Sequence, residues 1–159
     1  MPRGSALVYR TFGATDALSV ARNLRILTRR RGVKLLIGAD EALATRVGAD
    51  GVHLPERLAN RARRIRARHP HWLITIAAHG SRATRRVADA VVVSAIFPSA
   101  STSAGKPIGP LRLAQIVRRS ACPVYALGGV HEATVARLLL TGVVGVAGVE
   151  AFEGPDPLS

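Results

Sequence analysis

The stretch CPVYALGGVHEATVARLLLTGVVGVAGV, residues 122–149, contains two short apolar runs separated by a pair of glycines and an amphipathic segment. The runs at 122–127 and 144–149 predict buried strands, and the segment at 131–140 predicts a helix between them. This order indicates two parallel strands that are joined by a right-handed crossover helix. The stretch decides the fold class, because the rest of the chain repeats the same alternation.

The repeat runs through the whole chain. The predicted strands lie at residues 6–10, 33–37, 51–54, 72–77, 90–94, 122–127 and 144–149. The predicted helices lie at residues 15–31, 40–47, 57–68, 81–87, 110–119 and 131–140. Seven strands in strict alternation with helices predict a TIM (β/α)8-type barrel of parallel strands that lacks one β/α unit.

Local signals support several of these boundaries. Asp16 or Thr15 can cap the first helix, and Pro110 suits a first helical turn. Gly32 and Gly142 suit the C-terminal ends of helices. An open, doubly wound sheet is the alternative fold, but it predicts a glycine-rich phosphate loop after the first strand, and YRTFGATDA (9–17) is not such a loop.

Length and composition predict a single α/β domain over residues 1–159. Hydrophobic residues make up 48% of the chain and aromatic residues 4%, which argues against disorder and for alanine-rich packing. Apolar runs such as DAVVVSAIF (89–97) are about half the ~20 residues that cross a bilayer, and residues 1–10 lack a signal peptide's apolar centre. We therefore expect a soluble, cytoplasmic protein without membrane contact. Cys122 lies in an apolar strand and is expected to be an inert thiol rather than a nucleophile.

The net charge of +13 raises the question of a nucleic-acid partner. Of the 23 basic residues, 21 are arginine, since Lys34 and Lys106 are the two lysines. The arginines gather on the predicted helices, mainly at residues 22–31, 61–68, 82–86 and 118–119. This distribution is typical of solvated helix faces, and no interleaved aromatic residues offer a base-stacking surface. A nucleic-acid partner is therefore not expected.

Titratable side chains stand at several predicted strand ends. The carboxyl ends of the strands build the active site of a β/α barrel, and there the sequence places Arg10, His53 and His79. An imidazole can transfer protons near neutral pH, so both histidines, together with Arg10, are candidate catalytic residues. The alternative is that each is a hydrogen-bonded strand-end histidine with no catalytic role.

Glycines and hydroxyl groups supply candidate phosphate ligands. Gly128 and Gly129 follow one late strand, and Gly148 ends the next, where backbone N–H groups could approach a phosphate. The alternative is that these glycines only permit close packing of helix and strand. The longest connection, 95–109, is rich in Ser, Thr, Gly and Pro, and a loop of this length is usually functional or mobile.

Three stretches together resemble the superfamily of thiamine phosphate synthase and TenI-type thiazole tautomerase. They are VGADGVHLP (47–55), AAHGSRATRRVADAVVVSAIFP (77–98) and CPVYALGGVHEATVARLLLTGVVGVAGVEAF (122–152). The resemblance implies a phosphate-binding (β/α)8 barrel whose ligand is a phosphorylated thiazole or pyrimidine. Because ALVYRTFG (6–13) resembles the second strand of the family, the first β/α unit is expected to be absent. Unpaired strand edges at the gap would favour a homo-oligomer.

The resemblance implies that much of the synthase machinery is replaced. Of the Gln, Arg and Lys that hold diphosphate in the synthases, only the Arg is kept, as Arg10, and Val8 and Phe12 stand at the other positions. Two Asp ligands of Mg²⁺ correspond to Ala39 and Leu58. We therefore expect no metal and no cofactor, because a hard Mg²⁺ ion needs oxygen ligands.

In the rest of the family pattern, hydroxyl groups are kept and other groups are lost. Ser99 and Ser101 keep the hydroxyls of two substrate-binding Thr residues, and His79 is retained. Glu150 replaces a Ser beside the phosphate, where a carboxylate would repel the ligand. The tautomerase histidine after the sixth strand of the family corresponds to Ala95.

Three functions follow from these observations. The first is an enzyme, or former enzyme, of thiamine biosynthesis that handles a phosphorylated thiazole or pyrimidine with most synthase residues lost. The second is a catalytically idle protein that binds a phosphorylated ligand or has a regulatory role. The third, nucleic-acid binding, predicts an affinity that falls steeply as the salt concentration rises.

Overall fold

The computed structural model describes residues 1–79, 87–99 and 105–149. Most of the predicted helix at 81–87 lies outside the described residues, as do Ser101 and Glu150. The chain divides into two compact units, Met1–Ile76 and Ala77–Ser159, which are described one at a time.

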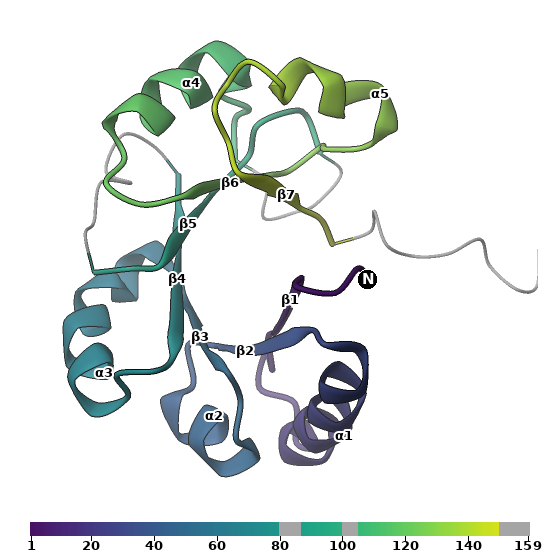
Figure 1. The fold of residues 1–159 in the computed structure, drawn as a ribbon, viewed down its shortest axis with the longest axis vertical. Helices are drawn as coiled ribbons and strands as arrows, with labels where there is room; N and C mark the ends of the chain where they lie inside the picture. The colour runs from purple at the N-terminus through teal and green to yellow at the C-terminus, as the bar shows by residue number, and fades with distance from the viewer. Residues whose placement is uncertain (80–86, 100–104, 150–159) are drawn as a thin grey trace, which may run out of the picture. The chain divides into compact units, whose positions relative to one another are not determined.

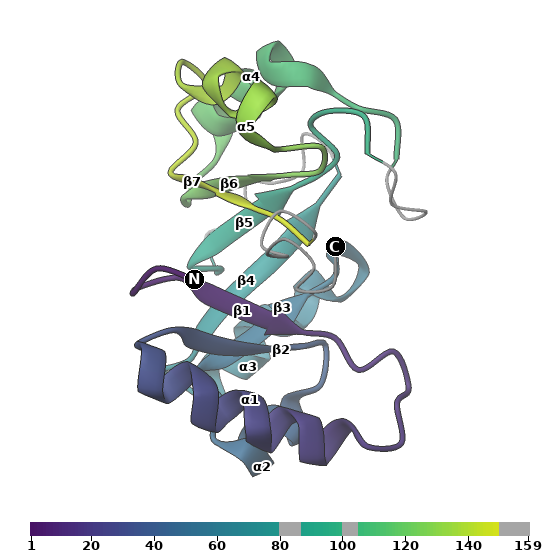
Figure 2. The same cartoon turned by 90° about the vertical axis from the view of Figure 1, so that its right-hand side faces the viewer.

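The first unit is a parallel sheet with helices on its outer side (Figures 1 and 2). Its elements in chain order are β1 (Ala6–Tyr9), α1 (Ala17–Arg31), β2 (Lys34–Gly38), α2 (Glu41–Val47), β3 (Gly51–Leu54), the 3-10 helix η1 (Glu56–Arg61), α3 (Ala62–Arg68) and β4 (Leu73–Ala78), whose last two residues begin the second unit. The strands pair in chain order, as in the register Val8↔Leu36 and Val52↔Ile74. This is the order that successive crossover helices predict.

The core of the first unit comes from continuous apolar runs. Leu35, Leu36 and Ile37 are all buried in β2, as expected of a parallel strand that is covered on both faces. Gly32 ends α1 in a left-handed conformation, with its N–H bonded to Arg29 O, as predicted. Asp16 precedes α1, but its side chain makes no capping hydrogen bond.

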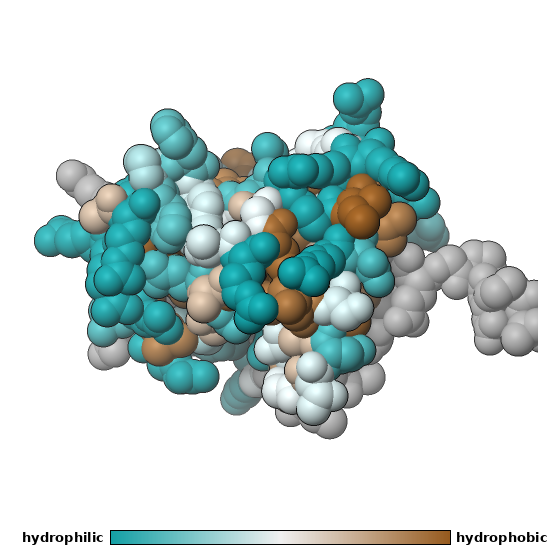
Figure 3. All heavy atoms as spheres, turned by 90° about the horizontal axis from the view of Figure 1, so that it is seen from below, coloured by the Kyte–Doolittle hydropathy of each residue, from teal (hydrophilic) through white to brown (hydrophobic). Residues whose placement is uncertain are grey.

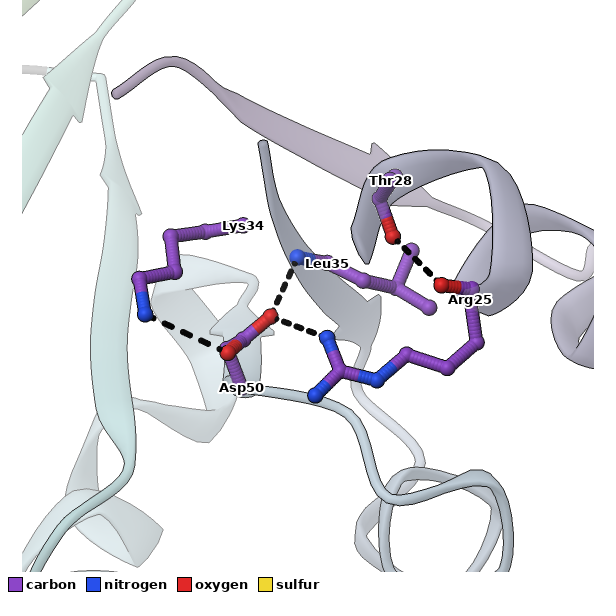
Figure 4. A network of polar contacts seen from close by, with 5 residues as sticks. All are labelled: Arg25, Thr28, Lys34, Leu35 and Asp50. Carbon is purple, nitrogen blue, oxygen red and sulfur yellow. Dashed lines mark hydrogen bonds and ion pairs between the residues drawn. The ribbon is translucent and has the colours of Figure 1, made fainter. Parts of the chain in front are cut away.

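The half-buried carboxylate of Asp50 connects α1, β2 and β3 (Figure 4). Asp50, which precedes β3, accepts hydrogen bonds from Leu35 N at 2.9 Å and from Arg25 Nη1 at 2.5 Å. Lys34 Nζ lies 3.4 Å from the other carboxylate oxygen. Burial by itself would raise the pKa of Asp50, but the Leu35 N–H bond and the charges of Arg25 and Lys34 outweigh it and lower that pKa.

The second unit is also a parallel sheet, with α4 and α5 on one side of it (Figures 1 and 2). Its elements are β5 (Ala90–Val93), α4 (Gly109–Arg119), β6 (Val124–Leu127), α5 (Glu132–Val135), the 3-10 helix η2 (Ala136–Leu138) and β7 (Gly145–Ala147). Strand β6 pairs with both neighbours, as in Val92↔Tyr125 and Ala126↔Val146. Pro110 lies in the first turn of α4, as predicted.

Apolar packing dominates this unit. Val91, Val93, Leu113, Ile116 and other buried residues form one cluster between the strands and α4. The helix predicted at 131–140 is shorter than expected, because it consists of four α-helical residues and one 3-10 turn. Among the described residues of the chain, no helix is long and apolar enough to span a membrane.

Candidate functional site

In the first unit, the carboxyl ends of β1 and β2 bring Arg10 beside Gly38. A Cβ atom on Gly38 would lie 2.9 Å from Arg10 Cγ and 3.3 Å from Tyr9 O, so glycine is what allows this approach. Arg10 is exposed, and its guanidinium carbon lies 4.4 Å from the centre of the Phe12 ring. The predicted ligand-binding arginine therefore stands at a strand end with its charge open to solvent.

His53 lies on β3 next to these two strand ends. It pairs in register with Gly38 on β2 and with Thr75 on β4. Its neighbours Val52 and Leu54 are buried on the opposite face of the strand, whereas the His53 side chain is half-buried. Its Nδ1 atom lies 2.8 Å from Thr75 Oγ1, which fixes the orientation of the ring.

The surroundings of His53 keep its ring neutral. Burial, and to a smaller extent the positive charge of Arg10, lower the pKa of His53 to about 4. At pH 7 the ring therefore carries no charge. Among the described residues, no group forms a hydrogen bond with His53 Nε2. This nitrogen is therefore available to form a hydrogen bond with a ligand.

In the second unit, His79 meets Ser94, which follows β5. His79 Nδ1 lies 3.2 Å from the Ser94 carbonyl oxygen and 3.4 Å from Ser94 Oγ. Because a carbonyl oxygen only accepts, Nδ1 carries the proton in that hydrogen bond. The His79 side chain is exposed.

Gly128 and Gly129 serve close packing in this unit. A Cβ atom on Gly128 would lie 2.9 Å from Ala95 Cβ, and one on Gly129 would lie 2.2 Å from Pro98 O. The Gly128 carbonyl accepts from Phe97 N at 3.0 Å. These contacts support the packing alternative, and α5 has only four residues to attract a phosphate.

The other predicted phosphate ligands are spread over the second unit. Ser99 is exposed and directly follows the segment that packs against Gly128 and Gly129. Gly148 is half-buried and directly follows β7. Ser101 lies outside the described residues. The roles of these three residues and of the glycine pair stay predictions.

The described residues near the end of β2 offer few oxygen ligands for Mg²⁺. At the family's metal position the chain has Ala39, and the adjacent Asp40 uses its Oδ1 atom to accept the Leu43 N–H at 2.8 Å as the cap of α2. Within residues 1–79, 87–99 and 105–149, no group of three His, Cys, Asp or Glu side chains could hold a metal ion.

The first unit also contains a cavity that the sequence does not reveal. It has a volume of about 770 Å³ and is lined by residues 38–42 at the end of β2 and by Arg46, Arg61, Arg64 and Arg68. The sequence predicts Arg61, Arg64 and Arg68 only as parts of solvated helix faces. Viewed from the side of α1 and α2, the surface is indeed largely hydrophilic (Figure 3).

Comparison with known proteins identifies the family. Residues 5–152 match the family model described as thiamine monophosphate synthase. The chain belongs to this family. A thiamine-phosphate synthase from Thioalkalivibrio sulfidiphilus is 37% identical over 147 residues, covering 86% of this chain and 68% of that protein. A thiamine-phosphate synthase from Roseiflexus sp. is 34% identical over 152 residues, covering 91% and 64%.

A solved structure of the family confirms the fold class. The thiamine phosphate pyrophosphorylase from Pyrococcus furiosus superposes with a TM-score of 0.77 at 25% identity, covering 91% of this chain and 72% of that one. With seven parallel strands in chain order, this member of the thiamine monophosphate synthase family has the predicted TIM-type α/β fold with one β/α unit fewer. It spans about two thirds of the length of these curated relatives.

Proposed function

We propose that this member of the thiamine monophosphate synthase family binds a phosphorylated thiazole or pyrimidine without Mg²⁺, and that His53 and Arg10 contact this ligand. The observation that carries the proposal is the neutral, oriented His53 ring at the end of β3, beside the exposed guanidinium of Arg10. Arg10 supplies positive charge for a phosphate group, and His53 supplies one hydrogen bond from its open ring nitrogen.

The low pKa that His53 has in the ligand-free protein favours a role in ligand binding over a role in proton transfer. A general base works best when its pKa is near the working pH, and a value of about 4 makes the free ring a weak base. A phosphate dianion next to the ring would stabilise its protonated form and raise that pKa. His53 would then gain its proton-transferring ability only with the ligand bound.

The replacement of synthase residues that the family resemblance implies favours a metal-free role. Coupling of a pyrimidine diphosphate to a thiazole requires Mg²⁺ in the family pattern, and Ala39 and Leu58 offer no ligand to it. Two activities fit what remains: metal-free proton transfer on the ligand, and binding without turnover. The weak basicity of His53 favours the second.

Calorimetric titration with thiazole phosphate tests the proposal. We expect binding of equal strength in EDTA and in Mg²⁺, and a loss of at least tenfold in affinity in His53→Gln and in Arg10→Gln. His71→Gln, at an exposed position outside the site, is the matched control and should bind like the wild type. Binding that requires Mg²⁺, or that survives both substitutions, would overturn the proposal.

A second measurement separates the two activities. The ligand is incubated with the protein in D₂O, and NMR follows the entry of deuterium into its carbon-bound positions. Exchange that His53→Gln abolishes would indicate proton transfer, whereas binding without exchange would indicate a ligand-binding protein without turnover.

A further inference from the structure

Thr75 is the buried neighbour of His53 in the first unit. It lies on β4 directly opposite His53 on β3 in the parallel register, so the two side chains are on the same face of the sheet. Thr75 is 8% exposed, and Ile74 and Ile76 on either side of it are buried on the opposite face. The register of the strands therefore brings a buried hydroxyl oxygen to within 2.8 Å of His53 Nδ1.

This contact can be made in two ways, which differ in the atom that donates. A neutral imidazole ring has one protonated and one unprotonated nitrogen, and a hydroxyl group can donate or accept. Either Nδ1–H donates to Thr75 Oγ1, or the Thr75 O–H donates to an unprotonated Nδ1. Because the His53 ring is neutral at pH 7, this choice also fixes whether the ring proton lies on Nδ1 or on Nε2.

The burial of Thr75 decides between the two arrangements. Among the described residues, the Thr75 hydroxyl has no hydrogen-bond partner other than His53 Nδ1. If Nδ1–H were the donor, the hydroxyl proton would be buried without an acceptor, which costs free energy. If the hydroxyl donates, its proton is bonded, and an unused acceptor lone pair is tolerated more readily than an unused donor. The second arrangement is therefore the more stable one.

We propose that Thr75 is a positioning residue that holds the proton of neutral His53 on Nε2, so that this nitrogen donates to an acceptor oxygen of the ligand. The ligand half of this inference rests on the proposed function, in which His53 and Arg10 contact a phosphorylated ligand. Nε2–H and the exposed guanidinium of Arg10 are both donors, as a phosphoryl group requires. With the proton on Nδ1, Nε2 would instead present a lone pair to the phosphoryl oxygens.

His79 of the second unit provides a contrasting case within the chain. The Ser94 carbonyl oxygen lies 3.2 Å from His79 Nδ1, and a carbonyl oxygen only accepts. The ring is thus protonated on Nδ1 where a carbonyl faces that nitrogen, and on Nε2 where a buried hydroxyl donates to it. The partner of Nδ1 sets the tautomer, and for His53 that partner is Thr75.

Nitrogen NMR of the ligand-free protein tests the tautomer. The histidine rings are labelled with ¹⁵N, and spectra at pH 7 distinguish a protonated ring nitrogen from an unprotonated one. We expect a protonated Nε2 and an unprotonated, hydrogen-bonded Nδ1 at His53 in the wild type and in Thr75→Ser, which keeps the hydroxyl. In Thr75→Val, which has a similar shape but no donor, the Nδ1 resonance should change. The matched control Thr28→Val removes another buried hydroxyl of the first unit and should leave the His53 resonances unchanged.

Calorimetric titration with thiazole phosphate tests the link to the ligand. Thr75→Val should bind at least about threefold more weakly than the wild type, because fewer of its His53 rings present a protonated Nε2 at any moment. Thr75→Ser and Thr28→Val should bind like the wild type. In a His53→Gln background, Thr75→Val should cause no further loss, since a positioning residue acts only through the residue that it positions.

Three results would overturn the inference. They are a wild-type His53 with its proton on Nδ1, an Nδ1 resonance that is the same in Thr75→Val as in the wild type, and an equal loss of affinity from Thr75→Val with and without His53. Failure of the proposed function would look different. If the wild type bound no thiazole phosphate, the ligand half would fail with the proposed function, while the spectra would still confirm or overturn the tautomer.

Discussion

The strand ends of the two units are held in place by different means. In the first unit, polar side chains connect the elements: Asp50 joins α1 to β2, and Thr75 orients His53. In the second unit, Gly128 and Gly129 let the backbone pack directly on the segment after β5. The first arrangement depends on charge and therefore on pH, whereas the second depends on the absence of side chains.

A substitution in the second unit should have the largest effect on the free energy of unfolding. Gly129→Ala places a methyl group 2.2 Å from Pro98 O at a φ of +63°, so we expect a loss of about 3 kcal/mol or more in the free energy of unfolding. Urea denaturation measures it. The control Gly13→Ala has a φ of +83° but open space around it, and should lose only about 1 kcal/mol. Equal losses in the two variants would show that the backbone at Pro98 moves away from the added methyl group at little cost in free energy.

Asp50→Asn tests the polar connection of the first unit. It keeps an acceptor for Leu35 N but leaves Arg25, whose side chain is 14% exposed, without its charge partner. We expect a loss of about 2 kcal/mol at pH 7. Asp16→Asn, at a side chain without a capping bond, should stay within about 0.5 kcal/mol of the wild type.

The pH dependence of this difference gives a further check. Because folding lowers the pKa of Asp50, its ionic contribution is present above the ordinary value of 3.8 and disappears as the pH falls through the lowered value. The stabilities of wild type and Asp50→Asn should therefore converge in strong acid. If the difference in stability between the wild type and Asp50→Asn does not change with pH, the contribution of Asp50 does not depend on its charge.

His53 makes the first unit sensitive to mild acid. Its pKa is about 4 in the folded protein and about 6.5 when unfolded, so the unfolded state binds the extra proton between these values. Stability should thus fall with decreasing pH, by about 1 kcal/mol between pH 7 and pH 5.5. His53→Gln should lack this component in denaturation series at the two pH values. An identical decline in both proteins would place the titrating group elsewhere.

The smallest effect is expected at the ion pairs of Glu41. Glu41→Gln removes the pairs with Arg61 and Arg68 near the surface, and such pairs contribute less than about 1 kcal/mol. Urea denaturation at pH 7 should therefore show a loss below about 1 kcal/mol in the free energy of unfolding. A much larger loss would show that Glu41 holds α2 against η1 and α3. Glu132→Gln, at an exposed residue of α5, is the control.

The sequence predicted the elements well and the contacts between distant residues poorly. Strand β3 was predicted with its observed bounds, and Pro110 and Gly32 marked helix ends correctly, because these signals act on the local backbone. The Asp50–Arg25 contact and the Thr75 partner of His53 were not predicted. Each joins residues more than 20 positions apart, whose approach depends on how the crossovers pack.

The sequence by itself determined the β/α alternation, the parallel order of the strands and the family, because apolar periodicity and motif spacing are properties of the chain. Tertiary structure alone decided which of the arginines line the cavity of the first unit, since α3 carries both Arg64, which lines it, and Arg63, which does not. It also decided that His53 is neutral. Burial and the nearby Arg10 charge set its pKa, and both arise only when β1, β2 and β3 lie side by side.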